Sequence, residues 1–216
     1  MARIRAVILD FDGVLAESNK VKDAAFDEFF NRYPEHAAAM RAYHLDHHAA
    51  PRRLKFRYLA DELMRESDVD AAVDSMAEAF TDLVAERVIA CPEVAGASAF
   101  LAEFSERIPL YISSVTPQEE LDRIIAARGV APHIRRAYGN PPYPKNEAIR
   151  TILDLETLGS DQVAFVGDSG SDFLVARETG LEFLGRDSGQ PFPAEAVDLE
   201  LAADMTEIAE RLRPLL

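Results

Sequence analysis

The stretch Ile4-Arg5-Ala6-Val7-Ile8-Leu9-Asp10-Phe11-Asp12-Gly13 decides the fold of this chain. Its apolar run predicts a buried strand over residues 4–10, and carboxylates stand at the end of that strand. Buried carboxylates are costly unless they meet a cation or take part in chemistry. Gly13 permits a sharp turn, so Asp10 and Asp12 can converge on one pocket. There, one carboxylate can attack while the other moves a proton.

The composition excludes several classes of function. The chain has 216 residues, 48% of them hydrophobic, and a formal net charge of −15. Because this charge repels phosphate backbones, we expect no nucleic-acid partner. A small phosphorylated substrate remains compatible with it, since a few local cations and a metal can reverse the local field. Cys91 is the only cysteine, which excludes an intramolecular disulfide and a thiolate zinc site.

The sequence shows neither a signal peptide nor a stretch long and apolar enough to span a membrane. We therefore expect a cytoplasmic, soluble protein with no membrane partner. A monomer and a homodimer are both compatible with the sequence.

Apolar residues recur at helical spacing from Ser18 to about Ala90, and no strand pattern interrupts them. Asp68 is placed to cap a long helix over residues 69–89. This segment is therefore predicted to be an all-helical insert, residues 18–90, that follows the first strand.

Strands and helices alternate after the insert. The strands are predicted at 110–113, 163–167 and 181–184, and the helices at 94–104, 117–128, 145–155 and 172–179. Alternation of this kind is typical of a parallel, doubly wound α/β sheet. The sequence therefore predicts an α/β core made of residues 1–17 and 91–216.

Thr116-Pro117-Gln118-Glu119 has the form of a capping box, with proline at the first helical position. It predicts that Thr116 caps the following helix. Residues 139–144 form a proline-rich stretch without helical spacing, which is expected to be a loop.

A second apolar run is followed by acidic residues, as the first one is. Val163-Ala-Phe-Val-Gly167 is followed by Asp168 and, four residues later, by Asp172. Ligands of open α/β sheets bind at the carboxyl ends of the strands, so these two acids are expected beside Asp10 and Asp12. Ligands that are all oxygen suit a hard divalent cation, and we expect Mg²⁺.

Two further residues complete a phosphate pocket. Ser114 stands at the end of the strand predicted at 110–113, with Ser113 as the neighbouring candidate, and Lys145 opens a helix after the proline-rich loop. A lysine is disfavoured at the positive end of a helix dipole, which suggests an anion nearby. A hydroxyl, a lysine and a metal around a nucleophilic carboxylate can stabilise the charge of a phosphoryl group.

These four motifs, in this order, resemble those of the haloacid dehalogenase (HAD) superfamily of phosphohydrolases, over about residues 4–18 and 94–184. The resemblance implies a HAD-like core in which the helical insert is the cap domain, as in phosphoglycolate phosphatases and β-phosphoglucomutases. It implies that Asp10 attacks phosphorus and becomes an aspartyl-phosphate. Asp12 would protonate the leaving oxygen and then activate water.

The same resemblance implies the remaining roles. Ser114 would donate to a phosphoryl oxygen, and Lys145 would neutralise charge on Asp10 and the phosphate. Asp10 and Asp168 would bind Mg²⁺ directly, together with the main-chain carbonyl of Asp12. Asp172 would bind it through water or orient the loop.

The acid at position 12 narrows the choice among the reactions of this superfamily. Dehalogenases of the superfamily lack an acid at this position, because a halide leaves without a proton. We therefore favour hydrolysis of the phosphate monoester of a small metabolite, either a sugar phosphate or a phosphoglycolate-like compound. A phosphomutase and a non-catalytic HAD-like binding protein remain alternatives. Related mutases carry a histidine about where this chain has Lys22, which weakens the mutase interpretation.

The helical insert supplies the candidates for substrate selection, which are cations: Lys22, Arg52, Arg53 and Lys55. Arginine suits bidentate contact with a carboxylate or phosphate, although a solvated helix face that pairs with Asp61 and Glu62 is the favoured interpretation of this run. His44, His47 and His48 have helical spacing that a metal site can use, but we interpret them as helix histidines without a metal.

Overall fold

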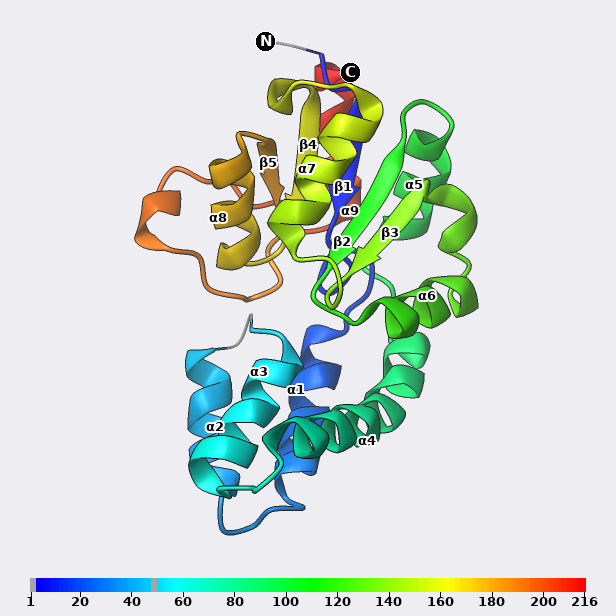
Figure 1. Ribbon diagram of the computed structural model, residues 1–216. Helices are drawn as coiled ribbons and strands as arrows, with labels where there is room; N and C mark the ends of the chain where they lie inside the picture. The colour runs from blue at the N-terminus through cyan, green and yellow to red at the C-terminus, as the bar shows by residue number, and fades with distance from the viewer. Residues whose placement is uncertain (1–2, 48–49) are drawn as a thin grey trace. The chain divides into compact units, whose positions relative to one another are not determined.

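The computed structural model describes residues 3–47 and 50–216 and consists of two compact units (Figure 1). The α/β unit comprises the residues up to Glu17 together with Pro92–Leu216, and the helical unit comprises Ser18–Cys91. The chain thus leaves the α/β unit after the first strand and returns before the second. The outgoing and returning segments are bonded to each other, since the Glu17 N–H donates to the Pro92 carbonyl at 2.9 Å.

The α/β unit is built on one sheet of five parallel strands in the order β3-β2-β1-β4-β5. These strands are β1 (Ala6–Leu9), β2 (Leu110–Ser114), β3 (Arg136–Gly139), β4 (Val163–Gly167) and β5 (Glu182–Gly185). From β1 the chain builds the sheet first toward β3 and then, from β4, in the opposite direction. The predicted doubly wound parallel sheet is therefore confirmed, and its switch point lies at β1 and β4.

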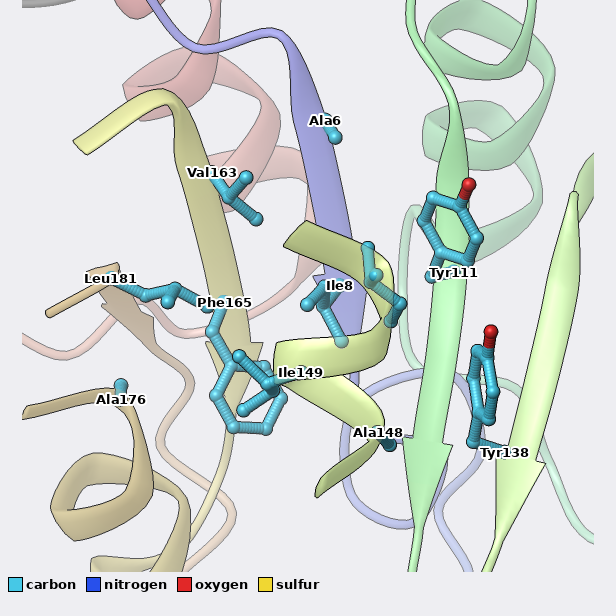
Figure 2. Packing of buried hydrophobic residues seen from close by; sticks show 11 residues of the cluster. Ala6, Ile8, Tyr111, Tyr138, Ala148, Ile149, Val163, Phe165, Ala176 and Leu181 are labelled. Carbon is cyan, nitrogen blue, oxygen red and sulfur yellow. The ribbon is translucent and has the colours of Figure 1, made fainter. Parts of the chain in front are cut away.

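Helices cover both faces of this sheet. They are α5 (Ala97–Ser105), α6 (Gln118–Ala127), α7 (Lys145–Glu156), α8 (Gly170–Thr179) and α9 (Met205–Leu212). Figure 1 shows α7 across one face and α9 behind the other, and α9 packs on α5. Ile8 and Phe165 meet Ile149 of α7 in the core of the first face (Figure 2).

Strand β1 is buried on both faces, which explains its uninterrupted apolar sequence. Ile8 belongs to the core under α7, while Val7 and Leu9 alternate to the opposite face. Burying a large aliphatic side chain contributes about 1.5–3 kcal/mol, so the centre of the sheet is held firmly. This fixes the position at which Asp10 leaves the strand.

Strand β3 and helix α9 were not predicted. β3 is a four-residue edge strand whose Arg136 is exposed, so it shows neither a long apolar run nor a clear alternation. Helix α9 has a recognisable signal, because Asp204 accepts hydrogen bonds from the N–H groups of Thr206 and Glu207. Its apolar residues follow at helical spacing.

The helical unit consists of α1 (Asn19–Phe30), α2 (Ala37–Asp46), α3 (Arg52–Arg57), a π-helical segment (Tyr58–Leu63) and α4 (Val69–Ala90). Its core is rich in buried phenylalanines: Phe26, Phe29, Phe30, Phe56 and Phe80. Asp68 is confirmed as the N-cap residue of helix α4, since its side chain accepts a hydrogen bond from the Ala71 N–H at 3.1 Å. In residues 3–47 and 50–216, no helix is both long and apolar enough to cross a membrane.

Candidate active site

Three carboxylates meet at the carboxyl edge of the sheet. Asp10 follows β1, Asp168 follows β4, and Asp172 lies in the first turn of α8. β1 and β4 are neighbours, and the Asp10 N–H donates to the Val166 carbonyl at 2.8 Å. Each aspartate offers one oxygen, these oxygens lie within 4.8 Å of one another, and all three residues are buried. The chain thus gathers acids more than 150 residues apart.

Gly167 lets Asp172 approach the end of β4. A Cβ atom at position 167 would stand 2.4 Å from the Cβ of Asp172, which no side chain tolerates. Asp172 Oδ2 accepts from Ser169 Oγ at 2.7 Å. Ser169 is the N-cap of α8, which begins at Gly170, two residues before the predicted start. Asp172 is therefore held inside the first helical turn and does not cap the helix.

Lys145 bridges two of the carboxylates. Its Nζ lies 3.0 Å from Asp10 Oδ2 and 2.5 Å from Asp172 Oδ1, and all three side chains are buried. Helix α7 begins at Lys145, as the sequence predicts. The other oxygen of Asp10, Oδ1, accepts from the Phe11 N–H at 2.8 Å. Both oxygens of Asp10 are therefore fixed in place.

The site is strongly negative for its degree of burial. Burial raises the pKa of Asp10 well above its usual value; Lys145 opposes this shift, while Asp172, Asp168 and Asp12 add to it. Burial acts to lower the pKa of Lys145, but the neighbouring Asp10 and Asp172 outweigh burial and raise it. One ammonium thus faces four carboxylates, an arrangement that attracts a further cation.

The donor set fits a hard divalent cation. Asp10, Asp168 and Asp172 supply only carboxylate oxygens, the ligands that Mg²⁺ prefers. The three oxygens lie close enough together that one such ion could be held by them directly or through water. Asp172 already binds Lys145 and Ser169, which suits it to an indirect role better than to a direct bond.

Asp12 is buried but lies outside the three-aspartate group. Its Oδ2 accepts a hydrogen bond from Thr116 Oγ1 at 3.3 Å, and the Thr116 N–H donates to Ser114 Oγ at 3.1 Å. Thr116 was predicted to be the N-cap residue of α6, but this is wrong, because the residue at that position is Pro117. Sequence reasoning therefore missed Thr116 as a site residue, although its hydroxyl two residues after Ser114 is a usable signal.

Ser113 and Ser114 are both fully buried at the end of β2, with Ser114 in contact with Thr116. Successive residues of a strand point to opposite faces, so Ser113 cannot share this arrangement. In the described part of the chain, Ser113 Oγ has no hydrogen-bond partner.

The candidates of the helical unit separate into two groups. The positive charges of Lys22 and Arg52 add to the lowering of the pKa of Lys55. Arg53 instead forms a surface ion pair with Asp74, with 2.5 Å between the paired atoms. His44 Nε2 lies 3.2 Å from Asp23.

His47 stacks on Tyr43, and His48 lies outside the described residues. Among residues 3–47 and 50–216, only the three-aspartate group has the arrangement of His, Cys, Asp or Glu side chains needed to hold a metal.

Comparison with solved structures shows close likeness over the whole chain at low sequence identity. A haloacid dehalogenase-like family hydrolase from Streptococcus pneumoniae superposes with a TM-score of 0.74 at 19% identity, over 97% of this chain and 99% of that one. A protein described as a predicted phosphoglycolate phosphatase from Haemophilus somnus gives 0.71 at 15% identity, over 99% and 100%. A protein assigned to the HAD hydrolases from Bacillus subtilis, described as bound to magnesium, gives 0.73 at 14% identity, over 98% and 99%.

At these identities the likeness establishes the fold alone, and no curated protein matches the sequence. The family follows from the sequence itself. Residues 7–185 match the family model of the haloacid dehalogenase-like hydrolases, a span that begins within β1, ends with β5 and includes every acid of the site. The chain therefore belongs to the haloacid dehalogenase-like hydrolase family, as its motifs predicted.

Proposed function

We propose that this hydrolase cleaves the phosphate monoester of a small metabolite through an aspartyl-phosphate, with Mg²⁺ as its cofactor. The observation that carries the proposal is the buried group of Asp10, Asp168 and Asp172 with Lys145 bonded to two of its members. Asp10 and Asp168, with the main-chain carbonyl of Asp12, are the proposed direct ligands. Bound there, Mg²⁺ supplies positive charge opposite the phosphoryl oxygens.

In the first proposed step, a carboxylate oxygen of Asp10 attacks phosphorus. The ester P–O bond breaks as the new bond forms, and Asp12 gives its proton to the leaving oxygen. Lys145 and the Phe11 N–H hold the Asp10 carboxylate in one orientation, so little freedom is lost on reaching the transition state.

In the second step, Asp12 takes a proton from water, the water oxygen attacks phosphorus, and the bond to Asp10 breaks to release phosphate. Ser114 Oγ accepts from the Thr116 N–H and donates its own O–H to a phosphoryl oxygen. Lys145 offsets the charge that develops beside Asp10.

The helical unit is proposed to act as the cap that selects the substrate, a sugar phosphate or a phosphoglycolate-like compound. Lys22, Arg52, Arg53 and Lys55 are the candidates for this selection. The presence of Lys22 where related mutases carry a histidine favours release of phosphate over transfer to a second hydroxyl.

Asp10→Asn tests the covalent mechanism. We expect hydrolysis of p-nitrophenyl phosphate to fall by at least about 10⁴-fold, because an amide is a poor nucleophile. Asp154→Asn, at an exposed position of α7, is the matched control and should retain activity. Activity near wild type in Asp10→Asn would remove the aspartyl-phosphate from the mechanism. Full turnover in excess EDTA, with no gain on adding Mg²⁺, would remove the metal.

A further inference from the structure

Arg186 is a buried cation of the α/β unit that the proposed mechanism does not use. It directly follows β5 and is 8% exposed. Its Nη2 donates to Glu17 Oε1 at 2.6 Å and its Nη1 to Glu17 Oε2 at 3.2 Å. Nη1 also donates to the Gly13 carbonyl at 3.1 Å, and Nε donates to the Ala203 carbonyl at 3.2 Å. Because burying a charge is costly, a guanidinium is held here only through such acceptors.

The Gly13 carbonyl belongs to a short loop, residues 11–17, that folds back on itself. The Gly13 N–H donates to the Ala16 carbonyl at 2.8 Å. Gly13 has a φ angle of +69°, which residues with a side chain rarely adopt. The carbonyl of the same residue accepts from Arg186, so the guanidinium ties the turn of the loop to the end of β5.

This loop carries Asp12, the proposed proton donor. Asp12 directly precedes Gly13, so a bond to the Gly13 carbonyl restrains the main chain from which the Asp12 side chain projects. At its other end, Asp12 Oδ2 accepts from Thr116 Oγ1 at 3.3 Å. A bond from a charged donor contributes more than one from a neutral hydroxyl. Arg186 is therefore the stronger of these two constraints.

The main chain of Arg186 reaches the second acidic loop. Its N–H donates to the Gly167 carbonyl at 2.8 Å, and Gly167 directly precedes Asp168. One residue thus bonds the main chain beside Asp12 and the main chain beside Asp168. These segments are far apart in the sequence, and Arg186 adds to the strand pairing that holds them at a fixed spacing.

Glu17 holds the guanidinium in its orientation. Its two carboxylate oxygens accept from two guanidinium nitrogens, a bidentate geometry that fixes the plane of the group. The Glu17 N–H itself donates to the Pro92 carbonyl at 2.9 Å, so the main chain of this partner is also anchored. The pair is therefore fixed on both sides of the contact.

We propose that Arg186 is a positioning residue for Asp12, and that Glu17 orients Arg186 for this role. By holding the Gly13 carbonyl, the guanidinium places the Asp12 carboxyl where it can give its proton to the leaving oxygen. The inference rests on the proposed function, because this proton transfer is part of it. The competing explanation is a fastener, in which Arg186 only joins the segment at Ala203 to the rest of the unit.

The choice of ester separates proton transfer from general damage. Phenolate is a poorer leaving group than p-nitrophenolate, so phenyl phosphate depends more on a well-placed acid than p-nitrophenyl phosphate does. At saturating Mg²⁺, kcat/KM covers the steps up to cleavage of the ester P–O bond. A lost fastener should lower both values by the same factor. A misplaced Asp12 should lower the value for phenyl phosphate more.

Arg186→Met removes the guanidinium but keeps an extended side chain. We expect kcat/KM to fall about 30- to 100-fold for phenyl phosphate and about 3- to 10-fold for p-nitrophenyl phosphate. Asp12→Asn is the reference, with the same direction and a larger difference between the esters. Arg211→Met is the matched control, because Arg211 also donates to a glutamate, Glu207, and to main-chain carbonyls. It should leave the ratio of the two esters unchanged.

Conservative variants sharpen the role of the pair. Arg186→Lys should restore part of the lost ratio, because an ammonium can reach one acceptor but lacks the fork. Glu17→Gln should change the ratio in the same direction by a smaller factor, since the amide oxygen still accepts. The double variant of Arg186→Met and Glu17→Gln should lose no more than Arg186→Met alone. If Arg186→Met does not fold, Arg186→Lys and Glu17→Gln carry the test.

A second readout needs no turnover. Amide hydrogen exchange of the Gly13 N–H, which is bonded inside the loop, reports whether the loop stays closed. We expect Arg186→Met to speed this exchange about 10-fold or more and Arg211→Met to leave it as in the wild type. The Ile8 N–H, in the centre of the sheet, is the internal reference for global opening.

The two readouts together decide the inference. Faster exchange at Gly13 with a changed ester ratio supports the positioning role. An equal loss on both esters overturns it in favour of the fastener, and so does exchange at Gly13 that matches the wild type. If the wild type hydrolyses neither ester, the proposed function fails. The exchange measurement then decides by itself whether Arg186 holds the loop.

Discussion

Two buried lysines, Lys145 in the α/β unit and Lys55 in the helical unit, stand in opposite electrostatic surroundings. Lys145 lies between the carboxylates of Asp10 and Asp172, and these raise its pKa. Lys55 lies against His44 and the ring of Phe26, and burial lowers its pKa to about 8. The same side chain is therefore held as a countercharge to carboxylates in one unit and beside a histidine and an aromatic ring in the other.

The largest expected effect separates the two lysines by activity. Lys145→Met should lower kcat for p-nitrophenyl phosphate by about 10²–10³-fold, because it removes the charge beside the proposed nucleophile. Lys55→Met should lower this rate much less, since Lys55 bonds His44 and not an aspartate of the three-aspartate group. Steady-state kinetics at saturating Mg²⁺ make the measurement, and equal losses in the two variants would end the distinction.

Asp172→Asn sharpens the account of Lys145. It keeps the size of the side chain but removes one of the two charges that hold the ammonium. We expect kcat to fall by about 10- to 100-fold, since a hydrogen bond between charged groups contributes about 1.5–3 kcal/mol. The Mg²⁺ concentration needed for half-maximal activity is measured on the same variant. If that concentration rises by a larger factor than kcat falls, Asp172 acts on the metal more than on Lys145.

Lys55 and Lys145 should also make the free energy of unfolding depend on pH in opposite directions. The folded pKa of Lys55 is lowered, so between about pH 8 and pH 10.4 the unfolded chain binds more protons and stability rises with pH. The folded pKa of Lys145 is raised, so its contribution is complete below about pH 10.4 and is lost at higher pH.

Urea unfolding of the wild type, Lys55→Met and Lys145→Met between pH 7 and pH 11 measures both slopes. Loss of the rising slope in Lys55→Met, with that slope intact in Lys145→Met, is the expected result. Identical pH profiles in the two variants would contradict the opposite environments.

The smallest effect is expected from a neutral donor. Thr116→Val removes the hydroxyl that bonds Asp12 at 3.3 Å but keeps the shape of the side chain. A bond of this kind contributes about 0.5–1.5 kcal/mol, so kcat should fall by about 2- to 10-fold. Thr116→Ser should recover most of the rate. A loss as large as that of Lys145→Met would show that Thr116 takes a direct part in the reaction.

Most of the α/β unit could be predicted because its signals are local. The apolar run before Asp10 and the glycine and acids after β4 are short patterns, and each appears at a strand end as expected. β3 could not be predicted, because an edge strand of four residues with one exposed face carries too little pattern. The Thr116 hydroxyl was assigned to the start of helix α6, whereas it bonds Asp12, because a capping box and a site hydroxyl look alike in sequence.

By itself, the sequence determined the family, the order of the four motifs and the residue types at each strand end. Only the tertiary structure decided how those residues are paired: Lys145 with both Asp10 and Asp172, Thr116 with Asp12, and Lys55 with His44. The physical reason is that residue types and strand ends are specified by neighbours in the chain. Pairing depends on distances across elements far apart in sequence, which only the packed core and its strand register set.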